Sequence, residues 1–183
     1  ILATERAGME WLPKDEWREK WLHATLTDER IPDKLILRSG WHPAASYAMI
    51  ELCPPMGHGQ GDAGAINSYI SQGSVLLSDT PYIVRDHELH NSFVVKREPW
   101  PEERVRWRGN EFADMKIALE DLHQTGGMAY ARVHITDYMK QPVTVDRRIF
   151  FLGDDGIWVR DTVESTEAYR ARIGPAWQTV ATY

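Results

Sequence analysis

From residue 34 onward, hydrophobic and polar residues alternate in short runs, and turn-forming stretches such as SQGS, QTGG and GDDG separate most of them. A period of two suits a strand with one buried face, because successive side chains point to opposite sides of a sheet. The runs that we predict as strands are 34–41, 46–52, 65–71, 74–79, 91–98, 104–109, 115–123, 128–138, 143–152, 156–163 and 169–177. Short strands at this spacing indicate an all-β protein, an antiparallel β-sandwich or barrel, rather than an α/β fold.

Residues 11–26, with the sequence WLPKDEWREKWLHATL, follow a different pattern. Trp17, Trp21 and Leu22 fall at positions i, i+4 and i+5, and would form one apolar face of a helix. Pro13 is well tolerated in a first turn, because the amide hydrogen that it lacks has no helical partner there. We therefore predict a short N-terminal helix ahead of the strands.

The chain has the length of one domain, since its 183 residues are 43% hydrophobic and can form a full core. No repeat, low-complexity segment or linker divides it. We predict a helical lead-in, or the end of a preceding helical domain, at residues 1–32, and a β-sandwich at residues 33–183. The pattern of residues 115–123 fits a helix as well as a strand. The sequence begins without Met and stops within a strand-like alternation, so we expect it to be part of a longer protein and truncated at its C-terminus.

The net charge is −6, and acidic and basic residues are interspersed. Such a distribution does not favour binding a polyanion through bulk charge, so we expect no nucleic-acid partner. No apolar stretch approaches the roughly 18 residues that a membrane span needs, so we expect no membrane partner. The single cysteine, Cys53, excludes an internal disulfide. The G-x-S-x-G elbow of serine hydrolases and the phosphate-binding glycine motif are absent too, which leaves the histidines and carboxylates as candidate chemistry.

Histidines and aspartates gather at residues 56–91, in the stretch MGHGQGDAGAINSYISQGSVLLSDTPYIVRDHELHN. A hairpin with its turn in SQGS would bring Asp79 back toward Asp62 and His58, with His90 near the mouth of the same hairpin. Imidazole and carboxylate groups on neighbouring strands are a usual ligand set for Zn²⁺. Aspartate is equally a common turn residue, and the spacing leaves both interpretations open.

The same stretch, read as GHGQGDAGAINSYISQGSVLLSD…HN and preceded by LILRSGW…YAMIEL, resembles the C-terminal β-sandwich of the heparinase II/III-like polysaccharide lyases. Those proteins carry gH-x-H-x-D-x-g-s leading into a strand, then G-x-x-l-l-x-D, then HN. The later stretch DYMKQPVTVDRRIFFLGDDGIWVRDTV resembles the family's arginine-bearing strand and the strand after it. The resemblance spans residues 34–163 and implies a two-layer antiparallel β-sandwich.

This resemblance implies that the chain is part of an enzyme that cleaves an acidic polysaccharide or oligosaccharide, such as a glycosaminoglycan or alginate, by β-elimination. In the family, an α/α toroid precedes the sandwich, the cleft lies between the two, and a periplasmic or extracellular bacterial location is implied. His58 matches the first motif histidine, which has a catalytic or substrate-contacting role. Asp79 and His90 match two ligands of a divalent metal, usually zinc, for which His58 or His87 could be the third. Gln60 and Asp62 would contact the substrate.

The sequence departs from the family pattern in two respects. Gln60 stands where the family has its second histidine, which is often the third metal ligand. The tyrosine and the asparagine or histidine of the toroid have no match on this chain, so we expect the isolated chain to be inactive. The alternative, from another class, is a non-catalytic carbohydrate-binding or structural β-sandwich whose metal only stabilises the fold.

Eight tryptophans raise the question of sugar stacking. Trp100 lies between prolines in EPWPEE, and it is the tryptophan that we expect to be exposed and to contact substrate. Trp41, Trp107 and Trp158 occupy strand alternations, and we expect them in the core because each ring buries a large apolar area.

Two strands carry ionisable residues that need a partner or solvent. In VDRRIFF, Arg147 and Arg148 fall on opposite faces, so one of them must form an ion pair or face solvent. His123 and His134 lie in predicted strands without a carboxylate motif nearby in the sequence, and we expect them to be structural.

Overall fold

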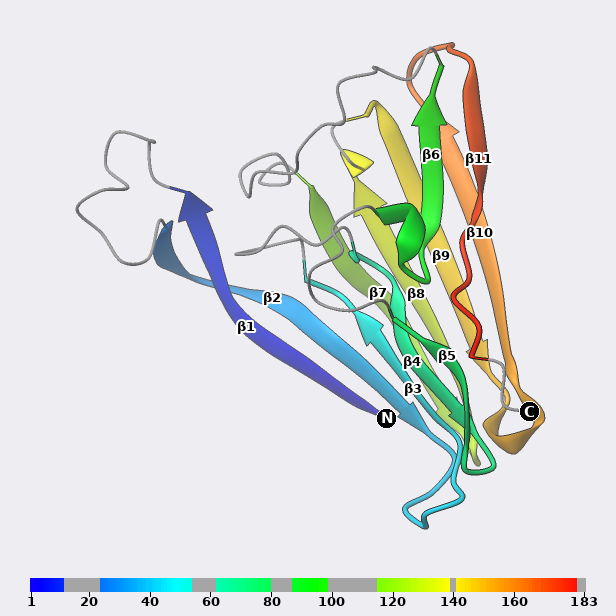
Figure 1. The fold of residues 1–183 in the computed structure, drawn as a ribbon. Coiled ribbons are helices and arrows are strands. Elements are labelled where there is room, and N and C mark those ends of the chain that lie inside the picture. Colours follow the sequence, from blue (N-terminus) through cyan, green and yellow to red (C-terminus); the bar gives the residue numbers. More distant parts are fainter. Residues whose placement is uncertain (12–23, 54–61, 80–86, 99–114, 139–140, 181–183) are drawn as a thin grey trace.

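The computed structural model is an all-β fold built from two antiparallel sheets and a separate pair of strands (Figure 1). It describes residues 1–11, 24–53, 62–79, 87–98, 115–138 and 141–180. The larger sheet has the strand order β1-β2-β3-β4-β5. Its strands are β1 (Leu2–Trp11), β2 (Ala24–Arg38), β3 (Tyr47–Glu51), β4 (Ile66–Ser71) and β5 (Ser74–Ser78).

The second sheet has the strand order β10-β9-β8-β7, and its strands follow one another in the chain as a meander. They are β7 (Lys116–Thr125), β8 (Met128–Thr136), β9 (Val143–Phe151) and β10 (Ile157–Ser165). The remaining pair joins β6 (Phe93–Arg97) to β11 (Ala171–Pro175). Two short 3-10 helices, η2 (His87–Leu89) and η5 (Gly153–Asp155), complete the described elements. Within the described residues, no helix is long and apolar enough to cross a membrane.

The all-β fold predicted from the hydrophobic alternation is confirmed, and every predicted strand that falls on described residues has a counterpart. The predicted strand 104–109 lies outside the described residues. Residues 115–123, whose pattern also fitted a helix, form most of β7 and pair with β8. Here the tertiary pairing decides between two locally acceptable structures.

The predicted N-terminal helix is not found. Leu2–Trp11 and Ala24–Arg38 form the antiparallel pair β1–β2, so both ends of the predicted helix at 11–26 are strand. Residues 12–23, which carry the apolar stripe, lie outside the described residues. The helical lead-in predicted for residues 1–32 is corrected in the same way, because β2 continues through position 32 into the sandwich.

The hydrophobic core fills the space between the two sheets. In β9, every second residue from Val143 to Phe151 is buried, and the residues between them are partly exposed, as expected for a strand with one core face. Side chains from both sheets belong to one cluster, including Leu35, Leu37, Ile50, Ile66, Val133, Ile135, Ile149 and Phe151. Burying an aliphatic side chain of this size stabilises a fold by about 1.5–3 kcal/mol, so this cluster is what holds the layers face to face.

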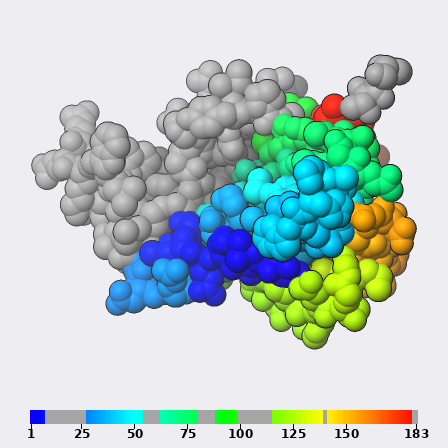
Figure 2. All heavy atoms as spheres, turned by 90° about the horizontal axis from the view of Figure 1, so that it is seen from below, coloured from blue at the N-terminus to red at the C-terminus, as the bar shows by residue number. Residues whose placement is uncertain are grey.

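The turns β2–β3, β7–β8 and β9–β10 gather at one end of the sandwich, which Figure 2 shows in cyan, yellow-green and orange. Asp154 of η5 accepts hydrogen bonds from Ser39 Oγ at 2.6 Å and from the Ser46 amide at 3.2 Å. These hydrogen bonds, led by that from Ser39, lower the pKa of the Asp154 carboxyl. The β4–β5 turn lies at this end as well (Figure 1), so the opposite ends of β4 and β5 point away from it.

Candidate functional site

The predicted site residues divide into two groups. His58, Gln60 and Trp100 lie outside the described residues, so their predicted roles stay predictions. Asp62 and Asp79 flank the hairpin β4–β5, as predicted, and His90 follows η2.

His90 and Asp79 form a buried pair. The Nδ1 atom of His90 lies 2.8 Å from Asp79 Oδ1, and the His90 side chain is fully buried while that of Asp79 is mostly buried. The Asp79 amide donates to the carbonyl of Asn67 at 2.9 Å, which continues the β4–β5 ladder and fixes the carboxylate. An ionised carboxylate can only accept, so the His90 Nδ1 hydrogen is donated to Asp79, which fixes the ring orientation.

Asn91, the next residue, holds this segment against β4. Its side chain donates to the Ile66 carbonyl at 3.0 Å, and the Ile66 amide donates to the Asn91 carbonyl at 2.9 Å. The two residues of the HN motif therefore have separate tasks: Asn91 binds the backbone of β4, and His90 faces Asp79.

Glu51, at the end of β3, is a site residue that sequence reasoning missed. It is buried, it accepts hydrogen bonds from the Cys53 amide at 3.2 Å and from Asn67 Nδ2 at 3.3 Å, and its carboxylate lies 3.6 Å from Lys34 Nζ. Burial, and then the charge of Asp62, raises the pKa of Glu51 to about 7. The signal in the sequence was a carboxylate at the end of the apolar strand YAMIE.

Asp62 lies within electrostatic reach of the pair. Burial raises the pKa of Asp62 to about 6, the charge of His90 opposes this shift, and the charge of Asp79 adds to it. The folded hairpin thus places Asp62 within electrostatic range of Asp79 and His90, and Glu51 within electrostatic range of Asp62. Carboxyl groups with pKa values this close to neutrality beside a buried imidazole are the arrangement from which proton-transfer sites and metal sites are built.

The donor set is chemically suitable for zinc, but the geometry changes the role expected of Asp79. Because His90 Nδ1 already contacts Asp79, Nε2 would be the ligating atom of this ring in a metal site. A carboxylate that receives the other ring hydrogen of a ligating histidine orients that histidine and raises its basicity. Asp79 fits this orienting role as well as it fits a direct ligand, and His58, the predicted third ligand, lies outside the described residues.

Two groups of three possible ligand atoms lie within 4.8 Å of one another among the described residues, and Asp62, Asp79 and His90 are not one of them; protein cations already neutralise both groups. In the group Asp33, Glu51 and Cys53, Lys34 Nζ lies 3.3 Å from Asp33. Burial raises the pKa of the Cys53 thiol to about 11, so this cysteine is protonated and a poor metal ligand.

The second group lies on the outer face of the sheet β10-β9-β8-β7. There Arg132 contacts Glu120 at 2.9 Å and Asp146 at 3.0 Å. His134 Nδ1 lies 3.0 Å from Asp146, although no carboxylate motif is nearby in the sequence. The carboxylate reaches it across the strand pair β8–β9, which the sequence order does not reveal.

Arg147 ties the second sheet to both sides of the cluster. Its side chain is 1% exposed and binds Asp161 through two hydrogen bonds, at 2.8 and 2.9 Å. Its Nη1 atom also donates to the carbonyls of Gly64, at 2.7 Å, and Asn91, at 3.3 Å. Gly64 follows Asp62 by two residues and Asn91 follows His90, so one guanidinium holds the backbone on either side of the site.

Tyr138 is unsuited to act as the acid of an elimination. Its hydroxyl is buried and donates to the Phe93 carbonyl, and burial raises the pKa of the phenol to about 12. A catalytic acid must reach the leaving oxygen, which a fully buried phenol cannot do.

The expectation that Trp41 and Trp158 lie in the core is wrong. Trp41 is 87% exposed in the β2–β3 turn, where Arg38 lies over its ring at 4.7 Å. Trp158 is 56% exposed because the inward positions of β10 belong to its neighbours Ile157 and Val159. Trp107, the third tryptophan expected in the core, lies outside the described residues.

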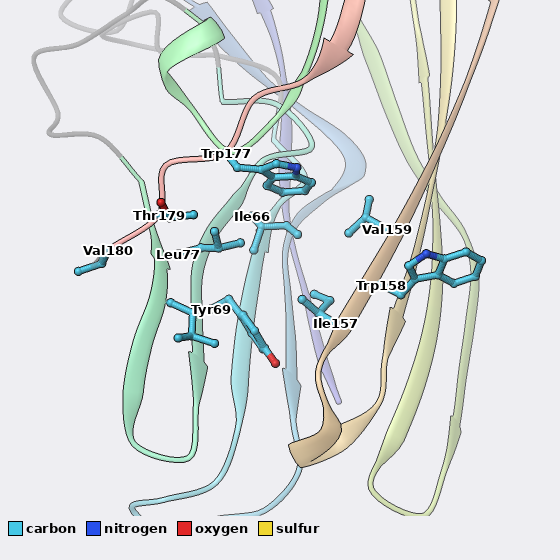
Figure 3. Close-up of a pocket in the computed structure, with 10 residues that line it drawn as sticks. Ile66, Tyr69, Leu77, Ile157, Trp158, Val159, Trp177, Thr179 and Val180 are labelled. Atoms are coloured by element: carbon cyan, nitrogen blue, oxygen red, sulfur yellow. The ribbon is translucent and has the colours of Figure 1, made fainter. Parts of the chain in front are cut away.

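A cavity of about 540 Å³ opens between the β4–β5 hairpin and β10 (Figure 3). Its lining is almost entirely apolar, and the Trp177 ring reaches into it while the Trp158 ring points away. The lining residues are Ile66, Tyr69, Leu76, Leu77, Ile157, Trp158, Val159, Trp177, Thr179 and Val180. Because no carboxylate, histidine or thiol borders this cavity, it offers no chemistry of its own.

No family model, curated protein or solved structure matches this chain. The fold and the site define the class directly: an antiparallel β-sandwich with a buried histidine–carboxylate cluster at one end of a hairpin. Any narrower assignment rests on the motif resemblance, and it is made as a proposal below.

Proposed function

We propose that this chain forms the β-sandwich side of a polysaccharide lyase that cleaves an acidic, uronic-acid-containing glycan by β-elimination. The buried Asp79–His90 pair carries the proposal, because these residues occupy the aspartate and histidine positions of the lyase-like motif and lie 2.8 Å apart in an all-β fold. Asp62, the third described residue of the motif, belongs to the same cluster.

The chemistry assigns a role to each part. A base removes the proton alpha to the uronate carboxylate, the electron pair forms a carbon–carbon double bond, and the glycosidic C–O bond breaks as an acid protonates the leaving oxygen. His58 is the candidate base on this chain, and Gln60, Asp62 and Trp100 would contact the sugar. The acid would come from a preceding helical toroid, and the protein would act in the periplasm or outside a bacterial cell.

A divalent metal, most suitably zinc, would brace the sandwich beside the cleft when bound, held by His90 with Asp79 and His58. The described residues support this part through their donor types, an imidazole beside carboxylates. Without metal, the chain's own contacts still position the site, since Asp79 orients His90 and Arg147 holds the flanking backbone.

The reaction type is tested by following the ultraviolet absorbance of the unsaturated product with the full-length protein that carries this chain. The panel is a set of uronic-acid polymers, including alginate, polygalacturonate and heparan sulfate, beside a neutral glucan. Absorbance that grows with one or more uronates and never with the glucan supports elimination. Product from residues 1–183 alone would contradict the proposal, because it would place both acid and base on this chain.

The second candidate function is a non-catalytic carbohydrate-binding sandwich. The exposure of Trp158, 56%, favours it, because a flat exposed ring can stack on a sugar face. Retention of a uronate polymer by the full-length protein, without any unsaturated product, would support this second function over the first.

A further inference from the structure

The outer face of the sheet β10-β9-β8-β7 carries a row of aromatic rings. The strand register places His123 opposite Tyr130, Tyr130 opposite Phe150, and Phe150 opposite Trp158. Neighbouring strand positions such as Ala131, Ile149 and Phe151 face the core, so these four residues point outward. The row therefore crosses the sheet from one edge strand to the other.

The four rings touch in sequence and stay open to solvent in part. Ring centroids are 6.1 Å apart for His123 and Tyr130, and 4.9 Å apart both for Tyr130 with Phe150 and for Phe150 with Trp158. His123 and Trp158 are exposed at the two ends, and Figure 3 shows the Trp158 ring directed away from the interior. Contiguous exposed aromatic surface on a sheet marks a place where another molecule binds.

A row of arginines runs beside the rings. Arg132, Arg148 and Arg160 face one another across β8, β9 and β10, each two residues from a ring of the aromatic row. Two residues along a strand span about 7 Å, so each arginine occupies the position next to a ring on the same face. The two rows form a strip with an apolar side and a basic side.

The positive charge of this strip is concentrated on β9 and β10. Arg132 is neutralised by Glu120 and Asp146. Arg148 donates to Thr162 Oγ1 at 3.3 Å, and Arg160 is exposed. Among the residues that the structure describes, no carboxylate lies at ion-pair distance from either arginine. Arg148 and Arg160, without an ion pair among the described residues, therefore occupy strand positions next to those of Phe150 and Trp158 on the same face.

We propose that this strip binds a strand of carboxylated polysaccharide, with sugar rings stacked on Trp158 and Phe150 and uronate carboxylates held by Arg148 and Arg160. A pyranose ring has an apolar C–H face that suits an aromatic ring, and a uronate carboxylate at its edge can accept two parallel hydrogen bonds from a guanidinium. The surface is separate from the Asp79–His90 cluster and requires no lyase chemistry, so it goes beyond the proposed lyase activity; it names the residues through which the second candidate function would act.

Single-stranded nucleic acid fits the same surface less well. Proteins that bind it track a phosphate at every nucleotide with a basic groove. Here Glu120, Asp121 and Asp146 share the outer face with the arginines, and the chain carries a net charge of −6. A glycan that needs only one or two carboxylate contacts beside its stacked rings avoids that repulsion.

Affinity electrophoresis of the full chain in gels that contain polygalacturonate tests the proposal. The matched ligand is the fully methyl-esterified polymer, which keeps the sugar backbone and loses the charge. Binding variants are Trp158→Ala and Arg160→Gln, and the matched controls are Trp41→Ala and Arg172→Gln, an exposed tryptophan and an exposed arginine elsewhere on the surface. Melting temperatures of all four variants confirm that each is folded.

We expect wild type to bind polygalacturonate and to bind the ester much more weakly. Trp158→Ala and Arg160→Gln should each weaken binding about tenfold, whereas the two controls should not. Equal binding by wild type and the two strip variants would overturn the proposal. Two other results would overturn it. In one, poly(U) competes more strongly than polygalacturonate and its binding is weakened by the same variants. In the other, Trp158→Ala self-associates less than wild type and binds the polymer equally well.

Discussion

Replacing Arg147 by methionine is the sharpest test of how the site is held. Methionine keeps most of the side-chain volume but removes both hydrogen bonds to Asp161, whose side chain is only 9% exposed, and the donor to the Gly64 carbonyl. Removing one partner of a buried ion pair leaves an uncompensated charge and typically costs about 3–5 kcal/mol. That is a large share of the roughly 5–15 kcal/mol by which domains are stable.

The neighbouring Arg148→Met variant is the control, because it makes the same chemical change on the outer face, where only Thr162 Oγ1 is lost. Urea unfolding should show a loss of about 3–5 kcal/mol for Arg147→Met and at most about 1 kcal/mol for Arg148→Met. The double variant Arg147→Met with Asp161→Leu should recover part of the loss, since no buried charge then remains. Equal losses for Arg147→Met and Arg148→Met would refute the reasoning.

Other changes probe the parts of the cluster separately. Burial raises the pKa of Glu51 to about 7, so the folded state holds a proton that the unfolded state releases near pH 4.5. The free energy of unfolding should therefore fall as pH rises between these two values, by roughly 3 kcal/mol at most. Glu51→Gln should flatten the fall in melting temperature between pH 5 and 8. An unchanged slope would show that another group titrates. Gly64 has φ +72°, and an added Cβ would lie 2.8 Å from the side chain of the core residue Ile135, so Gly64→Ala should destabilise the fold by about 2–3 kcal/mol in urea unfolding. The control Gly126→Ala, at φ +56° with open space around the added Cβ, should cost only about 1 kcal/mol. Similar losses in the two variants would contradict the tight contact at Gly64. Asp79→Ala and His90→Ala should each abolish zinc in elemental analysis of protein purified without chelator, and wild-type protein free of zinc at neutral pH would refute a metal role.

The strands were predictable because their signal is local and strong. Alternation in VTVDRRIFF and MAYARVHIT specifies one buried face, and the turns between such runs contain residues that favour reversal. The β1–β2 pair was not predictable in this way. Leu2–Trp11 has a weak alternation, and its pairing with Ala24–Arg38 is a tertiary contact that the order of residues does not reveal.

The site was predictable only in part, for a related reason. Hairpin geometry alone placed Asp62 near Asp79, since the turn between them fixes the return of the chain. Glu51 belongs to the cluster through the β3–β4 pairing, and Asp146 reaches His134 through β8–β9, and neither pairing can be read from residue order. The exposure of Trp158 depends on which face of β10 meets the core. In the stretch IWV, Ile157 and Val159 lie on one face and Trp158 on the other, and because both faces are apolar the sequence does not decide between them.

The central claim, that the Asp79–His90 pair belongs to the site of a polysaccharide lyase, is tested most directly by one comparison of rates. Unsaturated product is measured from the full-length protein as wild type, His90→Gln and His134→Gln, on the uronate polymer that wild type cleaves fastest. His134 is the matched control, because it forms a similar pair with Asp146 at 3.0 Å on the outer face. We predict that His90→Gln lowers the rate at least about a hundredfold, as expected when a residue that supports catalysis is lost, while His134→Gln stays close to wild type. Equal rates for His90→Gln and wild type, or no product from any uronate, would contradict the account.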